Sequence, residues 1–174
     1  DYDFRYGHQR VSLGGEIKSS TLELTANSYS GISKWKTGKN GNTERALSGY
    51  DLEIGAQIPF IPSAKIYLKK FNWEMYDATD IEGTDYSFNF SQILNSNVGL
   101  EVSHRDYSGA STDESFIRLN YKAPFSDQKI EERASFFSQY MFKNRSMKPH
   151  MLDKVRRNNA IVVQTKFSSG VGGV

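Results

Sequence analysis

The histidine side chains are the first candidates for acid–base chemistry or metal binding, but they do not cluster. His8, His104 and His150 lie far apart in the sequence, without the short spacing of metal-binding motifs. His8 falls in a turn motif, which favours a structural hydrogen bond over catalysis. The chain has no cysteine, so it has no thiolate metal site, cysteine nucleophile or disulfide. We predict no catalytic, cofactor or metal site, and we do not expect an enzyme.

Two pairs of titratable residues could still share proton transfer. Asp51 precedes Glu53 by two residues, and His104 precedes Asp106 by two residues. Such pairs can act as acid and base in hydrolases. Because no Ser-His-Asp order accompanies them, we prefer the interpretation that they satisfy a polar, solvated interior.

Basic residues near the C-terminus offer little evidence for a polyanionic partner. Lys154, Arg156 and Arg157 could face lipid or nucleic acid, but basic residues at a helix end more often satisfy its terminal carbonyls. The 22 Lys and Arg against 20 Asp and Glu leave a net charge of only +2, so we expect no nucleic-acid partner.

The clearest pattern in the sequence is an alternation of apolar and polar residues, which is typical of half-buried β-strands. Between Tyr50 and Phe60, the even-numbered residues are apolar and most odd-numbered ones are polar or glycine. A short run at Tyr2–Tyr6 brings the number of such segments to eight. The other segments are 10–17, 22–27, 64–69, 86–91, 98–103 and 117–122.

The connections between these segments alternate strictly between short and long. Links 18–20, 61–63 and 92–96 are short, whereas 31–48, 74–82 and 106–113 are long. Up-and-down outer-membrane barrels have short turns at the periplasmic rim and long loops outside. The mean hydropathy of -0.60 does not oppose this, because the lumen and loops of such barrels are polar. A soluble sandwich or ligand-binding β-barrel would alternate as well, and remains an alternative.

We therefore predict an all-β fold, an antiparallel up-and-down transmembrane β-barrel over residues 1–125. Charges of both signs fall on the inner parity of its strands, where a wet or plugged lumen would accept them at less cost than a dry core. The predicted lumen-facing residues are Glu16, Glu53, Lys65, Lys69, Glu101 and Arg118.

The chain after the last strand changes its periodicity. Apolar residues at helical spacing over 127–143 predict a periplasmic amphipathic helix, within a helical segment that spans 126–157. Residues 158–174 look extended, and ten extended residues reach about 33 Å, enough to thread a membrane pore. The alternative is that 158–167 form one more barrel strand. The predicted pore-linker residues are Arg157, Asn158, Asn159, Ile161 and Val163.

Several motifs resemble the intimin and invasin family, the inverse autotransporters of type Ve secretion. The resemblance covers nearly the whole chain, and it is carried by Asp1-Tyr2-Asp3-Phe4, Gly7-His8-Gln9-Arg10, Leu13-Gly14-Gly15-Glu16, Glu44-Arg45, Gly49-Tyr50-Asp51-Leu52 and Arg157-Asn158-Asn159-Ala160-Ile161-Val162. It implies a twelve-stranded barrel of which eight strands are visible here, with a periplasmic helix and a linker in the pore. The segment between Phe125 and Arg157 departs from the family in composition.

The resemblance implies a bacterial outer-membrane anchor that exports a C-terminal adhesin-type passenger. Implied partners are outer-membrane lipid, the protein's own passenger, the barrel-assembly machinery and periplasmic chaperones. A host receptor would bind only through the passenger. The alternative is a self-contained eight-stranded barrel, structural or a small pore, in which Tyr2–Tyr6 would pair with Ser115–Tyr121.

Overall fold

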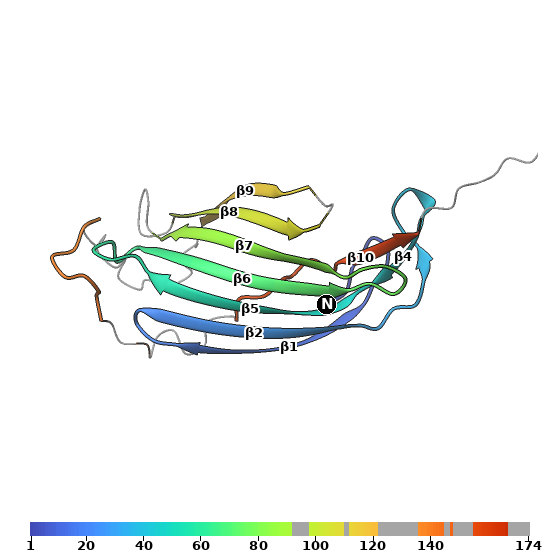
Figure 1. The fold of residues 1–174 in the computed structure, drawn as a ribbon, viewed down its shortest axis with the longest axis horizontal. Helices are drawn as coiled ribbons and strands as arrows, with labels where there is room; N and C mark the ends of the chain where they lie inside the picture. The colour runs from blue at the N-terminus through green and yellow to red at the C-terminus, as the bar shows by residue number, and fades with distance from the viewer. Residues whose placement is uncertain (92–97, 110–111, 122–135, 145–146, 148–154, 167–174) are drawn as a thin grey trace, which may run out of the picture.

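Within the residues that the structure describes, the larger of two antiparallel sheets has seven strands in chain order. The computed structural model describes residues 1–91, 98–109, 112–121, 136–144, 147 and 155–166. The strand order is β1-β2-β5-β6-β7-β8-β9, so each strand pairs with its sequence neighbour in the sheet (Figure 1). Its strands are β1 (Arg10–Lys18), β2 (Leu22–Gly31), β5 (Ser48–Gln57), β6 (Ala64–Glu74), β7 (Ile81–Phe90), β8 (Val98–Ser108) and β9 (Glu114–Tyr121).

The smaller sheet lies at one end of the larger one (Figure 1). It consists of β10 (Val163–Lys166), β4 (Thr43–Ala46) and β3 (Lys36–Thr37), in that order, with a 3-10 turn at Lys39–Gly41. Strands β3 and β4 belong to the long connection between β2 and β5. The C-terminal strand thus pairs with a loop and not with the seven-stranded sheet.

The Tyr2–Tyr6 strand predicted from the sequence is wrong. Tyr2 makes only an isolated bridge to Gln9, and the chain turns between them through Gly7, whose φ of 70° suits glycine. Among the described residues, β1 pairs only with β2 and β9 only with β8. The pairing that a self-contained eight-stranded barrel required is therefore not found there.

The predicted C-terminal helix is also wrong over residues 136–144, which form turns and bends. The backbone N–H of Ser138 donates to the carbonyl of Phe60, and the carbonyl of Met141 accepts from the N–H of Phe60. These bonds join the segment to the β5–β6 turn. The N–H of Ser138 and the carbonyl of Met141 thus bond to a distant residue and not within a helix. Residues 127–135 of the predicted helix lie outside the described part of the chain. Within the described residues, no helix is long and apolar enough to cross a membrane.

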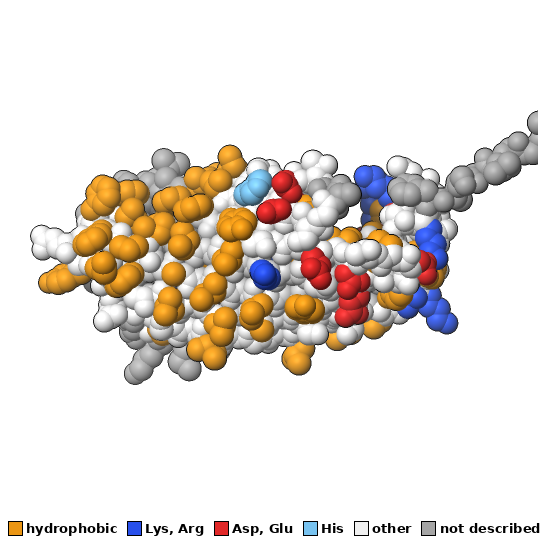
Figure 2. Space-filling model, in the orientation of Figure 1, with side chains coloured by type: hydrophobic (Ala, Val, Ile, Leu, Met, Phe, Trp, Pro, Cys, Tyr) orange, Lys and Arg blue, Asp and Glu red, His pale blue; other side chains and the backbone are white. Residues whose placement is uncertain are grey.

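The two faces of the larger sheet differ sharply. Along β5, Asp51, Glu53 and Gln57 are buried on the inner face, whereas Leu52 and Ile54 are exposed on the outer face. The same alternation continues through the neighbouring strands and leaves an apolar belt on the outer face (Figure 2). Its exposed members include Leu22, Leu24, Leu52, Ile54, Ile66, Leu68, Tyr86, Phe88, Val102, Ile117 and Leu119.

The belt covers only part of each strand. Toward the β6–β7 and β8–β9 loops, the outer face becomes polar and charged (Figure 2); its outward residues there include Lys70, Glu74, Glu82, Asp106 and Ser108. On the inner face at this end, a small core forms around Tyr29, Leu47, Phe71 and Trp73. The rings of Tyr29 and Trp73 lie 5.1 Å apart.

A glycine on β5 tests the packing of this core. A Cβ on Gly49 would overlap the carbonyl of Asn72 and lie 2.7 Å from Cε3 of Trp73. We expect Gly49→Ala to lower the free energy of unfolding by about 1–3 kcal/mol, measured by circular dichroism in urea titrations. Gly15→Ala is the control, because a Cβ there meets nothing within 4 Å. Equal effects of the two substitutions would contradict the packing described.

Candidate functional site

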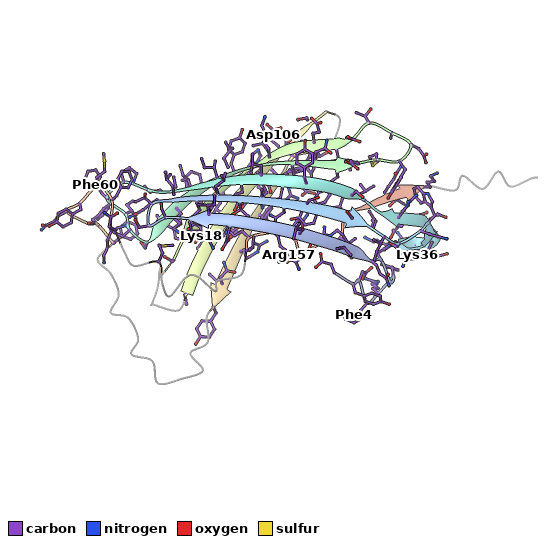
Figure 3. All side chains as sticks on the ribbon, turned by 90° about the horizontal axis from the view of Figure 1, so that it is seen from below. Phe4, Lys18, Lys36, Phe60, Asp106 and Arg157 are labelled. Atoms are coloured by element: carbon purple, nitrogen blue, oxygen red, sulfur yellow. The ribbon has the colours of Figure 1, made fainter. Side chains whose placement is uncertain are left out.

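Residues 155–162 run along the inner face of the larger sheet toward β10. Figure 3 shows Arg157 on this side of the sheet. Polar side chains from β1, β2 and β5 contact this segment, which we call the inner-face linker. Strand alternation explains why they point here, because the apolar residues of the same strands occupy the other face.

Arg156 connects the inner-face linker to two buried carboxylates of the sheet. Its Nε lies 2.7 Å from Oε1 of Glu53, which is only 2% exposed, and its Nη1 lies 3.7 Å from Oε2 of Glu101. The guanidinium also stacks 4.0 Å from the ring centre of Tyr67. Lys69 is a second partner of Glu53, at 3.3 Å. A buried carboxylate requires such pairing. Arg156 therefore compensates the negative charge of Glu53, which the strand alternation places on the inner face.

Arg10, at the start of β1, holds the backbone of the linker. Its Nη2 donates to the carbonyl of Asn158 at 2.5 Å, and its Nη1 donates to that of Ala160 at 2.9 Å. Asp1 accepts from the same guanidinium at 2.8 Å, and the ring of Tyr29 lies 4.4 Å beneath it. Asp1 and Tyr29 thus hold the Arg10 guanidinium in the position from which it donates to the linker.

Two further donors extend this set of backbone contacts. The side-chain amide of Asn27 donates to the carbonyl of residue 156 at 2.9 Å, and the N–H of Leu47 donates to the carbonyl of residue 162 at 2.9 Å. The hydroxyl of Tyr29 accepts from the N–H of residue 158 at 2.9 Å. The carbonyls bound in this way belong to every second residue: Arg156, Asn158, Ala160 and Val162. The inner face therefore binds an extended backbone much as a neighbouring strand would.

Beyond residue 162, the linker enters β10 and contacts loop residues. Val163 pairs with Ala46, and Lys166 pairs with Thr43. The side chain of Gln164 accepts from the N–H of Tyr76 at 2.9 Å, in the β6–β7 connection. Residues 163–166 are extended, and their strand partner β4 lies in a long connection. The assignment of 158–174 to a pore-threading linker stays a prediction.

The six charged residues predicted to face a lumen lie on the inner face, and each of them has a partner of opposite charge. Glu16 contacts Lys18 at 2.8 Å, Lys65 contacts Glu23, and Arg118 contacts Glu101 at 3.4 Å. Lys69 and Glu53 complete the set. The role of these residues as the wall of a lumen stays a prediction.

A cavity of about 1130 Å³ separates the inner-face linker from the far strands β7–β9. Polar and aromatic side chains line it, including Asp85, Arg105, Tyr107 and Phe116. Arg105 is held by Asp85 at 2.6 Å. Such a lining suits water and polypeptide better than an apolar small molecule.

The predicted linker residues make unequal contributions. Arg157 donates to Ser12 at 2.5 Å and to Asp1 at 2.7 Å, and Asn159 accepts from Arg157 at 3.2 Å. Ile161 is half-buried. Sequence reasoning missed Arg156 because it placed the basic residues at a helix end; residues 155–162 are not helical. The available signal was the pair of acidic residues, Asp51 and Glu53, on the inward-facing positions of β5. Buried carboxylates there require cations from other segments of the chain.

The two titratable pairs considered for acid–base chemistry face opposite sides of the sheet. Asp51 is on the inner face, where Asn27 and Tyr29 both donate to it at 2.7 Å. His104 is on the outer face and shares a 2.9 Å hydrogen bond with Ser115. The structure therefore does not bring the pairs together. His8 shares a buried hydrogen bond of 3.1 Å with Glu44 of β4, which confirms the structural role predicted for it.

Comparison with known families decides what kind of domain this is. Residues 1–159 match the family model described as the inverse autotransporter, beta-domain. The chain belongs to this family. The resemblance of its motifs to the inverse autotransporters is thereby confirmed for this β-domain.

The relatives of this β-domain include intimins. Intimin of Escherichia coli O127:H6 (strain E2348/69 / EPEC) is 24% identical over 180 residues, and the alignment covers 95% of this chain. Intimin of Citrobacter freundii is 23% identical over 180 residues, with the same 95% coverage. The chain spans only 18% of the length of either intimin. A solved chain from work on the in-meso crystallisation of membrane proteins shares the fold, with a TM-score of 0.77, 20% identity and coverage of 95% of this chain and 70% of that chain.

Arg10 provides a test of the backbone contacts. We expect Arg10→Met to remove two charge-assisted hydrogen bonds to the linker, each worth about 1.5–3 kcal/mol. Amide hydrogen exchange over residues 158–162 should accelerate by roughly tenfold or more, since about 1.4 kcal/mol corresponds to a factor of ten. Lys18→Met is the control, because Lys18 lies on the same strand as Arg10 but pairs with Glu16 at 2.8 Å and not with the linker backbone. Unchanged exchange in Arg10→Met would show that Arg10 does not hold the linker.

Proposed function

We propose that this β-domain anchors a protein in the bacterial outer membrane and that the inner-face linker leads to an adhesin-type passenger on the cell surface. The observation that carries the proposal is the set of inner-face contacts to the linker backbone. Membership of the inverse autotransporter family supports the membrane context. Because the chain spans a minor part of each intimin, the passenger and its export belong to the proposal.

The outer face supports a membrane location. Its apolar side chains form a continuous belt, and soluble monomers rarely leave an apolar surface of this kind in water. Lipid would cover the belt, while the charged outer residues beyond it would lie above the hydrocarbon. The long loops are at that charged end, which matches the extracellular end of outer-membrane barrels.

The direction of the linker supports export. Arg156 contacts β5 and β6 midway along the sheet, through Glu53 and Tyr67. Ten residues later, Lys166 pairs with β4 and contacts Asp77 at 2.5 Å, both in long connections. The chain thus travels along the inner face toward the rim that we assign to the cell exterior, where a passenger would begin.

The same contacts would also let the linker act as a plug in the passage. Backbone binding at alternate carbonyls is independent of most linker side chains, so an extended segment of varied sequence can be held. The ion pair of Arg156 with Glu53 then fixes its register. Once export ends, these contacts would keep the linker in place and narrow the passage.

Lipid exposure of the belt predicts an asymmetric effect of charge. We expect Ile54→Arg to destabilise the protein folded in phospholipid vesicles by about 2–4 kcal/mol, because arginine on a lipid-facing strand is costly near the bilayer centre. Ser108→Arg, on the polar part of the outer face, should change it by less than about 1 kcal/mol. If Ile54→Arg proves as mild as Ser108→Arg, lipid does not cover the belt.

Cysteine pairs test the linker's position in cells. In the full-length protein, Thr43→Cys with Lys166→Cys should form a disulfide, because these residues are direct antiparallel partners and such Cα atoms lie within disulfide range. A membrane-impermeant reductant should cleave this disulfide on intact cells. Ser19→Cys with Lys166→Cys should not cross-link, because Ser19 lies in the short β1–β2 turn.

Passenger export is tested with an epitope fused after Val174 in the complete protein with its signal. Externally added protease should remove the epitope from intact cells that carry an inserted barrel. An epitope that stays periplasmic while the barrel inserts would contradict export.

A further inference from the structure

Besides the outer face of the sheet, a second apolar surface lies at the rim that carries the short turns. Residues 136–144, which we call the rim strap, cross this rim outside the seven-stranded sheet. Ser138 and Met141 are tied to Phe60 of the β5–β6 turn by two backbone hydrogen bonds of 2.8 Å. The last residue of the strap accepts a 3.0 Å hydrogen bond from the hydroxyl of Ser20, in the β1–β2 turn. The strap is therefore fixed to two turns of the rim.

The rim strap exposes a dense group of apolar side chains. Five of its first seven residues are aromatic or methionine, and their exposed fractions run from 44% at Phe142 to 75% at Tyr140. Phe60, to which the strap is bonded, is 46% exposed as well. Leaving such a group in water is unfavourable. The five residues are Phe136, Phe137, Tyr140, Met141 and Phe142.

The strap lies at the same end of the molecule as the apolar belt. Figure 2 shows apolar side chains continuing from the outer face to the end where the short turns lie, while charged side chains gather at the other end. Figure 3 places Phe60 at the tip of that end. The apolar surface is thus continuous from strands to strap. A lipid layer that covers the belt would meet the strap next.

We propose that the rim strap, together with Phe60, is an interfacial anchor that inserts its aromatic side chains into the phospholipid layer at the short-turn rim. This inference rests on the proposed membrane location of the β-domain. Aromatic rings suit the boundary between headgroups and acyl chains, because they pair an apolar body with a polarisable or polar edge. Tyr140 adds a hydroxyl, and the exposed Lys143 adds a cation that suits lipid phosphate.

The anchor ties the tail to the membrane before the tail enters the inner face. The strap ends twelve residues before Arg156 in the sequence, so fixing it at the rim limits how far from that rim the linker can start. Lipid contact at the rim and the Glu53 ion pair inside would then act on the two ends of one short segment.

The absence of cysteine in this chain makes a single-site label feasible. Tyr140→Cys is introduced into the full-length protein lacking other cysteines, labelled with the environment-sensitive fluorophore NBD, and reconstituted into phosphatidylethanolamine and phosphatidylglycerol vesicles. Quenching is measured with a lipid that carries a nitroxide near the top of its acyl chain. Leu68→Cys, on the belt, is the membrane reference, and Thr79→Cys, exposed in the β6–β7 loop, is the aqueous reference.

We expect label at position 140 to lose fluorescence to a degree comparable with position 68, and position 79 to lose little. Quenching at 68 but not at 140 would overturn the anchor and leave the membrane location intact. Such a result would be expected if the strap instead binds a periplasmic protein. Failure of quenching at 68 would overturn the membrane location and the anchor with it.

Phe137→Ser combined with Tyr140→Ser gives an independent readout. Labelled at Gln139→Cys, an exposed position of the strap, this variant should show weaker lipid quenching than the same label on the unsubstituted strap. The control is Ser138→Ala, which removes a hydroxyl group but leaves the aromatic group. Equal quenching in the variant and the control would contradict insertion through these rings.

Discussion

A carboxylate that is withdrawn from water has to be paired, and Glu53 imposes this condition at the centre of the inner face. Its side chain is 2% exposed, and the strand alternation that puts Ile54 outside leaves it no other direction. Lys69 supplies one cation from the adjacent strand. Arg156 supplies the second from a segment more than a hundred residues later. The ion pair places the C-terminal segment against the sheet. The backbone carbonyls of residues 156, 158 and 160 then lie within hydrogen-bond distance of Arg10 and Asn27.

This single constraint links the two faces to one function. The outer face gathers apolar side chains that need a non-aqueous partner, and the inner face gathers charges that need one another or water. A sheet of this kind is unsuited to a dry soluble core. It is suited to a membrane wall with a polar interior, where an extended segment can be bound through its carbonyls. The loop strand β4 continues the same binding by main-chain pairing with β10.

Period two in the sequence was sufficient to predict the strands of the larger sheet and which parity carries charge, because adjacent residues of a strand must face opposite sides. It was insufficient wherever a distant partner decides the conformation. Tyr2–Tyr6 alternates but turns back on Gln9. The apolar residues of 136–144 have helical spacing, yet the backbone of Ser138 and Met141 bonds to Phe60. Arg156 was unrecognised because its partner, Glu53, is close only after the tail has folded back.

The central claim, that the tail is held on the inner face by the pairing of Glu53 with Arg156, is tested most directly by a double-mutant cycle. Glu53→Gln, Arg156→Met and the double variant would be compared by the opening free energies of the linker amides over 158–162, obtained from hydrogen exchange. The account predicts that the two single effects are strongly non-additive, with a coupling energy within the range of about 0.5–3 kcal/mol found for residues in contact. Additive effects would contradict it.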